Sequence, residues 1–404
     1  MKSKNKSKNE TDSLAELNEI TDKFLKDRGK VVGRNGFEKG DEVGMKLLLY
    51  PIDTLDEFID TLKSGEEIDA VYRSGYHLLN QGDVKRARLI LEKCIEAADH
   101  IKYTYGKAWA YAGLGNTFTN TDPKEALANH KIALNIFDEL ESNAGLARVC
   151  TDMALDYKGL NDFDMALKLL NDALKYYEKL NDFDNVGNCC WRIGNMYLNL
   201  GFLNKKDYGR YEKKAVTCFK RAEEMYKKTG DDVERARVMR NFADIAFEKG
   251  DIKKAREIYK NALDLDKDKN RIGRAFNISG IARTYLVEKN FNKALDLVNE
   301  AIEIYDDVNY ISDKCDLCLF TADLCHGCGR DDDARRYLQE AKEGYKEIGN
   351  KEGLARTYLM LGTICLACGD FKGVKKYGDM AVKADPEIMK KMAEEIKEAL
   401  RNRK

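Results

Sequence analysis

The chain has 404 residues, 43% of them hydrophobic and 34% charged, which is enough for two or three compact domains or one extended repeat array. Its 69 Lys and Arg residues nearly balance its 70 Asp and Glu residues, so the overall charge argues against a nucleic-acid or membrane-surface binder. No apolar run approaches the ~20 residues that a membrane span needs, and no hydrophobic signal core opens the chain. We therefore expect a cytoplasmic protein.

Two further counts narrow the fold class. Eleven Cys scattered through a chain of this length do not resemble a secreted disulfide framework, so we expect reduced thiols. Only three prolines interrupt 404 residues, which leaves long stretches free to form helices. The composition predicts an almost all-α protein.

The N-terminal segment differs from the rest of the chain. Residues 1–13 open with "MKSKNKSK" and predict a disordered basic tail. Residues 14–65 predict a helical extension in which two amphipathic helices flank the connector "RGKVVGRNGFEKGDEVG". That connector is rich in glycine but lacks the Lys-Ser/Thr pair of a phosphate loop, so we interpret it as an exposed link. The two helices are expected to cap the first repeat or to occupy the groove of the array.

Residues 66–385 repeat a pattern about every 40 residues, in which two small residues stand seven positions apart. The first small position is filled by Ala87, Ala126, Ala166, Ala215, Ala255, Ala294, Ala334 and Val374. A third column, about twelve residues earlier, contains Gly75, Gly115, Ala154, Gly194, Ala243, Ala282, Ala322 and Gly362. The pattern predicts eight pairs of amphipathic helices, with small residues where two backbones cross closely.

One spacing in this series is 49 residues instead of about 40. We attribute it to an insertion near residues 204–212, "NKKDYGRYE", which is expected to lengthen one turn without altering the flanking pattern. The final segment, residues 386–404, predicts a C-terminal capping helix with a polar outer face and a basic tail.

The repeated small residues, with Tyr or Phe three positions after the first-helix Gly or Ala, resemble tetratricopeptide repeats. Stretches such as "GLGNTF" and "RIGNMYLNLG", and the 40-residue period, are similar to the long-repeat subgroup of kinesin light chains, Leu-Gly-Asn adaptors and Rap regulators. The resemblance covers residues 68–394. It implies an all-α, right-handed superhelical solenoid of about eight hairpins with capping helices, whose concave face is lined by the first helix of every hairpin.

If the small residue of each first helix is numbered 8, positions 2, 5, 6, 9 and 12 are expected to line that face. In the resembling adaptors, Asn at position 9 holds the main chain of an extended peptide, and Asn116 and Asn195 match that position. Tyr72 and Trp191, expected to be exposed, would act as aromatic anchors. The candidate partner-binding residues are Tyr72, Asn116, Arg148, Trp191, Arg192, Asn195, Arg237, Arg240, Asn241, Asp244, Arg283, Asp323 and Arg356.

Two Cys-x-x-Cys pairs in "CDLCLFTADLCHGC" suggest a metal site at first sight. On one helix their outer members, Cys315 and Cys328, would lie roughly 20 Å apart, whereas thiolates that share a zinc ion lie within about 4 Å. We therefore expect most of these thiols to be small core residues, and no metal or other cofactor. Cys328 and Cys368 fall at a position that is polar in most repeats, which leaves a metal-sensing or redox-sensing role open.

No catalytic motif is present, so we expect a protein that is not an enzyme. The primary hypothesis is a scaffold or adaptor that binds a peptide or helix of a partner protein, with neither nucleic acid nor membrane as a partner. The alternatives are a signalling or transcriptional regulator switched by a groove ligand, and a metal-sensing or redox-sensing protein that uses the C-terminal cysteines. Neither the partner nor the oligomeric state follows from the sequence.

Overall fold

A computed structural model describes residues 62–266, 270–387 and 389–390. These ranges contain sixteen α-helices, one 3-10 helix and no strand, which confirms the all-α prediction. The expected N-terminal tail and helices, and the C-terminal segment from residue 391, lie outside the described residues. The chain divides into two compact units, an N-terminal unit (Met1–Arg221) and a C-terminal unit (Ala222–Lys404), each described by itself below.

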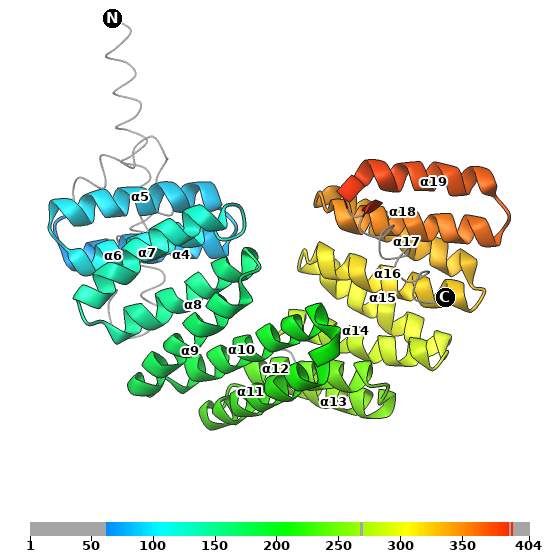
Figure 1. The fold of residues 1–404 in the computed structure, drawn as a ribbon, viewed down its shortest axis with the longest axis horizontal. Coiled ribbons are helices and arrows are strands. Elements are labelled where there is room, and N and C mark those ends of the chain that lie inside the picture. The colour runs from blue at the N-terminus through cyan, green and yellow to red at the C-terminus, as the bar shows by residue number, and fades with distance from the viewer. Residues whose placement is uncertain (1–61, 267–269, 388, 391–404) are drawn as a thin grey trace, which may run out of the picture. The chain divides into compact units, whose positions relative to one another are not determined.

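The helices alternate as first and second members of antiparallel hairpins (Figure 1). The first helices are α4 (Gly65–Asn80), α6 (Thr104–Asn116), α8 (Asn143–Gly159), α10 (Phe183–Leu203), α12 (Asp232–Glu248), α14 (Arg271–Val287), α16 (Ile311–Gly327) and α18 (Lys351–Ala367). The second helices are α5 (Val84–His100), α7 (Pro123–Glu139), α9 (Phe163–Leu180), α11 (Tyr208–Thr229), α13 (Ile252–Asp266), α15 (Phe291–Asp307), α17 (Asp331–Glu347) and α19 (Phe371–Ala384).

The turns between paired helices follow directly from the sequence. In "GD" and "ND" turns the first residue takes a left-handed conformation, with φ of 79° at Gly250 and 60° at Asn161. The following Asp caps the next helix, and the side chain of Asp162 accepts a hydrogen bond from the Met165 amide at 3.0 Å. Two short residues therefore both end one helix and begin the next.

The small columns lie at the helix crossings. Ala126, Ala166 and Ala255 are fully buried, and so is the second small column, from Ala133 to Ala381. Where the third column is Gly, a side chain of the second helix fills the space, and a Cβ on Gly194 would lie 2.5 Å from the ring of Phe219. Gly362 is an exception, since a Cβ there would come no closer than 3.8 Å to Tyr377. Close backbone approach explains these columns everywhere except in the last hairpin.

The insertion does not lengthen a turn as expected. Instead, α10 continues to Leu203 and α11 begins at Tyr208, so these helices have 21 and 22 residues, against 17 in α8 and α12. The 3-10 turn η2 (Lys205–Asp207) joins them. The prediction was wrong because the extra residues extend both helices beyond the common length and leave only a short connection between them.

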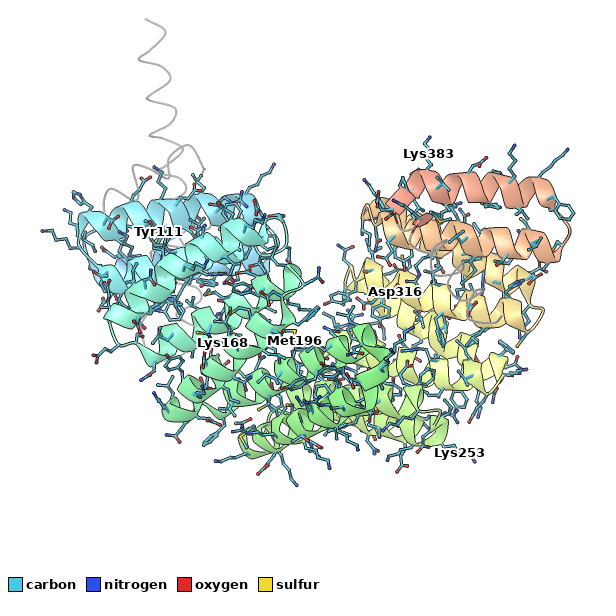
Figure 2. All side chains as sticks on the ribbon, viewed as in Figure 1. Tyr111, Lys168, Met196, Lys253, Asp316 and Lys383 are labelled. Atoms are coloured by element: carbon cyan, nitrogen blue, oxygen red, sulfur yellow. The ribbon has the colours of Figure 1, made fainter. Side chains whose placement is uncertain are left out.

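Successive first helices contact each other in both units, α4 with α6 and α6 with α8, and α12 with α14, α14 with α16 and α16 with α18. Exposed residues of second helices, such as Lys168, Lys253 and Lys383, point into solvent (Figure 2). We call the surface made by the first helices of a unit its first-helix face. Among the residues that the structure describes, no helix is long and apolar enough to cross a membrane.

Candidate partner-binding surface

An aromatic shelf lies on the first-helix face of the N-terminal unit. Tyr72 of α4 stacks on Trp109 of α6, with ring centroids 5.9 Å apart and an interplanar angle of 14°. Tyr76, one turn along α4, meets Tyr72 edge-on at 6.3 Å. Tyr72 was expected to be exposed, but it is half-buried because Trp109 of the neighbouring hairpin covers it, and this burial raises its pKa to about 12.

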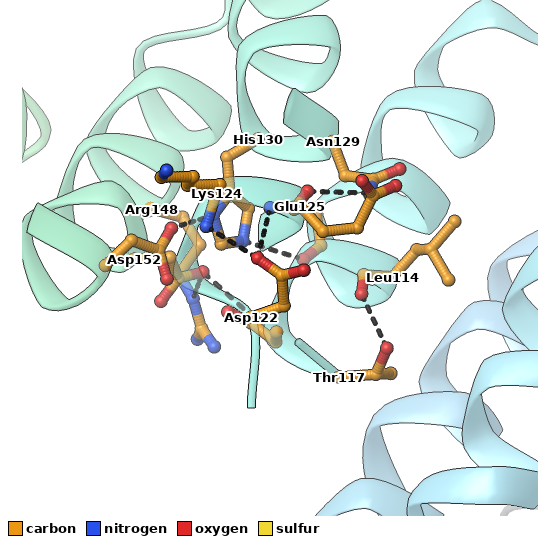
Figure 3. Close-up of polar contacts among 12 residues, drawn as sticks. Leu114, Thr117, Asp122, Lys124, Glu125, Asn129, His130, Arg148 and Asp152 are labelled. Atoms are coloured by element: carbon orange, nitrogen blue, oxygen red, sulfur yellow. Dashed lines mark hydrogen bonds and ion pairs between the residues drawn. The ribbon is translucent and has the colours of Figure 1, made fainter. Parts of the chain in front are cut away.

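A polar group adjoins this shelf and joins three successive first helices. Arg148 of α8 donates from Nε to Asp152 Oδ2 at 2.9 Å (Figure 3). Its guanidinium lies 5.6 Å from the ring centroid of Tyr76. Asn116 of α6 donates from Nδ2 to the same carboxylate oxygen at 3.2 Å. The Asp152 carboxylate raises the pKa of Arg148, so this arginine stays charged at every physiological pH.

We name these residues the N-terminal cluster: Tyr72, Tyr76, Trp109, Asn116, Arg148 and Asp152. Asp152 is 8% exposed, whereas the Arg148 side chain is 44% exposed. A fixed carboxylate therefore holds a cation at the surface beside flat aromatic rings. Such a surface can pair with a carboxylate and pack against an apolar side chain of the same ligand.

The C-terminal unit has a different arrangement. The Arg283 guanidinium of α14 lies against two neighbouring rings, 4.7 Å from the centroid of Phe247 of α12 and 4.8 Å from that of Phe320 of α16. Its Nη1 is 3.8 Å from Asp244 Oδ1, which also accepts a hydrogen bond from Tyr259 Oη at 2.5 Å. We name these five residues the C-terminal cluster. It brings the predicted residues Asp244 and Arg283 together.

Arg240 has another role, since it is turned into the core. It donates to Asp266 Oδ2 at 3.1 Å, and the two side chains are 14% and 0% exposed. Asn277 and Asn270 donate to the same carboxylate at 2.7 and 3.1 Å. Burial raises the pKa of Asp266, and Arg240 and the two amides act against that shift. This network joins α12, α13 and α14 from inside, so Arg240 is a poor candidate for partner contact.

The other predicted residues are not gathered into a cluster. Trp191 is half-buried, not exposed as expected, and its carbonyl accepts a hydrogen bond from Asn195 Nδ2 at 2.9 Å. Arg192 donates to Asn188 Oδ1 at 2.5 Å, and Arg237 pairs with Glu234, in each case on the same helix. Half-buried Asn241 and exposed Asp323 and Arg356 complete the set.

Sequence reasoning missed several residues of these clusters. Trp109, Asp152, Phe247 and Phe320 stand at positions 2, 6, 12 and 6 of their first helices, so the repeat numbering already marked them as lining the face. They could have been found by considering every residue at those positions, whether polar or apolar. Tyr259 comes from a second helix, and no column pointed to it.

The cysteines divide into buried and exposed thiols. Nine of the eleven are buried or half-buried, and Cys328 and Cys368, at the ends of α16 and α18, are exposed. The residues that the structure describes contain no group of three or more His, Cys, Asp or Glu side chains placed to hold a metal ion. Of the two exposed thiols, Cys368 has a carboxylate neighbour, since its Sγ is 3.9 Å from Asp331 Oδ2.

The family follows from comparison with known sequences. The tetratricopeptide repeat family profile matches residues 192–268, which span α10 to the end of α13. Residues 192–268 therefore consist of tetratricopeptide repeats. Helix hairpins and buried small columns of the same kind are present in both units.

A curated relative of this chain is the 43 kDa receptor-associated protein of the synapse from Tetronarce californica. The two are 26% identical over 196 residues, which are 40% of this chain and 48% of the relative. The chain therefore matches about half the length of that protein.

Solved structures share the fold at lower identity. The apo form of the quorum sensor NprR from B. thuringiensis superimposes with a TM-score of 0.57 at 18% identity, covering 93% of this chain and 99% of that one. NprR in complex with its cognate peptide NprX gives a TM-score of 0.51 at 16% identity, with 86% and 99% covered. The apo form of RapI gives 0.53 at 16% identity, with 70% and 99% covered.

Proposed function

We propose that this tetratricopeptide-repeat protein is a non-catalytic adaptor that binds a peptide or helix of a partner protein on its first-helix face. The observation that carries the proposal is the N-terminal cluster, in which three successive first helices combine an aromatic shelf with a surface-exposed arginine. Aromatic and arginine side chains are the residues most often responsible for affinity at protein interfaces. The peptide-bound NprR and the receptor-associated relative support a protein or peptide as the ligand class.

The cluster also favours one kind of ligand. Asp152 is buried and holds Arg148 from the protein side, so the outer edge of the guanidinium remains available to a carboxylate of the partner. Arg can bind such a carboxylate with two parallel hydrogen bonds. The Tyr72 and Trp109 rings offer a flat apolar contact beside it. We infer a ligand that presents an acidic residue close to an apolar one.

The test is affinity purification from the native cell followed by mass spectrometry. The variant Tyr72→Ala/Arg148→Ala removes one aromatic and one cation from the N-terminal cluster. The matched control Tyr176→Ala/Lys179→Ala removes the same residue types from the second helix α9, where the ammonium lies 5.4 Å from the ring centroid.

We expect the cluster variant to lose at least one specific partner tenfold or more, and the control to retain it. If both variants retain every partner, or both lose the same ones, the first-helix face is not the binding surface. Small-angle scattering with the captured peptide then separates an adaptor, whose dimensions stay constant, from a regulator that changes conformation on binding.

A further inference from the structure

The insertion between α10 and α11 forms an exposed apolar tip. Phe202 and Leu203, adjacent at the end of α10, are 54% and 71% exposed. We call residues 202–214 the tip. Single exposed apolar side chains are common on protein surfaces, but two large neighbours at a helix end indicate an interaction site.

The exposure is built into the local structure. The Phe202 ring lies 5.5 Å from that of Tyr208, and Asn204 Nδ2 donates to Asp207 Oδ2 at 3.0 Å, which closes the 3-10 turn. Behind the turn, the rings of Tyr197 and Tyr211 stack at 6.3 Å. The tip is therefore held in place by aromatic contacts while Phe202 and Leu203 remain in water.

Positive charge surrounds the apolar pair. The tip contains five cations, Lys205, Lys206, Arg210, Lys213 and Lys214, against two carboxylates, Asp207 and Glu212. Glu212 is 8% exposed, so its charge is turned inward. Lys214 lies 4.9 Å from the ring centroid of Tyr197, and the other four cations are exposed and form no ion pair within the described part of the chain.

We propose that the tip binds an anionic lipid surface. Phe202 and Leu203 enter the boundary between headgroups and acyl chains, and the surrounding lysines and arginine contact lipid phosphates. A stable protein interface buries about 800 Å² on each partner around an apolar centre, whereas Phe202 and Leu203 are the only exposed large apolar side chains between residues 202 and 214. Membrane docking needs only a small apolar wedge and a local excess of cations.

This inference departs from the expectation of no membrane partner, which rested on the balanced charge of the whole chain. The balance is an average, and the tip has a strong excess of cations. Binding through one such tip is reversible, because stable anchoring requires a second signal. Phe202 and Leu203 lie in the part of α10 that extends beyond the 17-residue length of α8 and α12, so the chain would be able to hold a partner while at a membrane.

Cosedimentation of the full chain with vesicles tests the proposal, using phosphatidylcholine alone and phosphatidylcholine with 30% phosphatidylserine. The variant Phe202→Ser/Leu203→Ser keeps every charge, including those of the basic tails, which also attract anionic vesicles. Its matched control, Leu140→Ser/Leu180→Ser, replaces two leucines that are 41% and 42% exposed at other helix ends. Circular dichroism and thermal unfolding confirm that each variant is folded.

We expect binding to the phosphatidylserine vesicles to fall at least tenfold in the tip variant and less than twofold in the control. Lys205→Ala/Lys206→Ala should weaken it about twenty-five-fold at low salt, from about fivefold for each lysine. Equal binding by the wild type and the Phe202→Ser/Leu203→Ser variant overturns the proposal. The proposal is also overturned if the wild type binds a labelled polyglutamate peptide and does not bind the vesicles. That result would make the tip a site for an acidic protein.

Discussion

The two units use arginines at groove-lining positions of the repeat for different purposes. In the N-terminal unit Arg148 is 44% exposed and held by Asp152 of its own helix, which leaves its charge at the surface. In the C-terminal unit Arg240 is 14% exposed and bound to Asp266, a fully buried carboxylate from the second helix. A groove position in the repeat therefore does not make an arginine a binding residue. Its burial and the origin of its partner decide the role.

The largest effect should come from breaking the buried network of the C-terminal unit. Asp266→Ala leaves the Arg240 guanidinium and two amides without their common acceptor, so we expect the free energy of unfolding to fall by about 3–5 kcal/mol. Arg148→Ala should cost about 1 kcal/mol or less, because exposed pairs contribute little. Urea unfolding followed by circular dichroism measures both.

An exposed ion pair in the same unit provides the control. Asp307→Ala removes the partner of Arg271, and the two side chains are 61% and 59% exposed, so stability should hardly change. If Arg148→Ala were as damaging as Asp266→Ala, the contrast between the two units would be wrong.

A buried polar pair in the N-terminal unit sharpens the comparison. His130 Nδ1 lies 2.6 Å from Asp156 Oδ2, and both side chains are fully buried, with His130 Nε2 3.2 Å from the Ala112 carbonyl. Both ring nitrogens of His130 therefore face oxygen atoms inside the core. His130→Ala should lower stability by about 3 kcal/mol, because it leaves Asp156 buried without that partner.

The double variant His130→Leu/Asp156→Leu is the informative partner of this experiment. Leu170 and Ile245 occupy the equivalent positions in other hairpins, so an apolar pair fits the repeat. We expect the double variant to be more stable than His130→Ala in thermal unfolding. Equal loss in both variants would mean that the site requires the charge pair.

Buried thiols should make the fold sensitive to alkali. Burial raises the pKa of Cys189 to about 11 from 9.0 in the unfolded chain. A raised pKa gives stability that is complete below pH 9 and is lost as the pH rises through about 11. The contribution is about 3 kcal/mol, from the difference between the two pKa values. The midpoint temperature of unfolding of the wild type should therefore decrease as the pH rises from 9 to 11, and it should decrease by less in Cys189→Ala. Identical dependence on pH in the two proteins would contradict ionisation of Cys189 as the cause.

The smallest change in stability is expected at two glycines, one from each unit. Gly194→Ala places a Cβ 2.5 Å from the Phe219 ring and should lower stability by about 1–2 kcal/mol through overpacking. Gly362→Ala meets nothing closer than 3.8 Å and should raise stability by up to about 1 kcal/mol, because alanine favours the helix. Thermal unfolding shows whether each variant is less or more stable than the wild type. A change in the same direction in both variants would show that close backbone crossing is not the reason for the small residues in this column.

The helix hairpins could be predicted because their determinants are local and repeated. Close crossings require small residues, and columns such as that of Ala166 and Ala255 record the crossings along the chain. Asp at a helix start and Asn or Gly before it mark the turns. The insertion could not be placed in the same way, because extending two helices and lengthening one turn leave the same spacing in the sequence.

The candidate surface could be predicted only in part. The repeat numbering pointed to Asn116 and Arg148, which the structure joins through Asp152. It could not foresee that Trp109 would cover Tyr72, since this stack depends on the distance between neighbouring hairpins. Nor could it separate Arg240 from Arg148, because the partner of Arg240 is a residue of another helix, brought near only by the fold.

The most direct test of partner binding on the first-helix face is hydrogen–deuterium exchange of the full chain, with and without a peptide derived from the captured partner. We predict that added protection concentrates in α4, α6 and α8, around Tyr72, Asn116 and Arg148, and is weak in the second helices α5, α7 and α9. Protection confined to the second helices, with the peptide bound, would contradict the account.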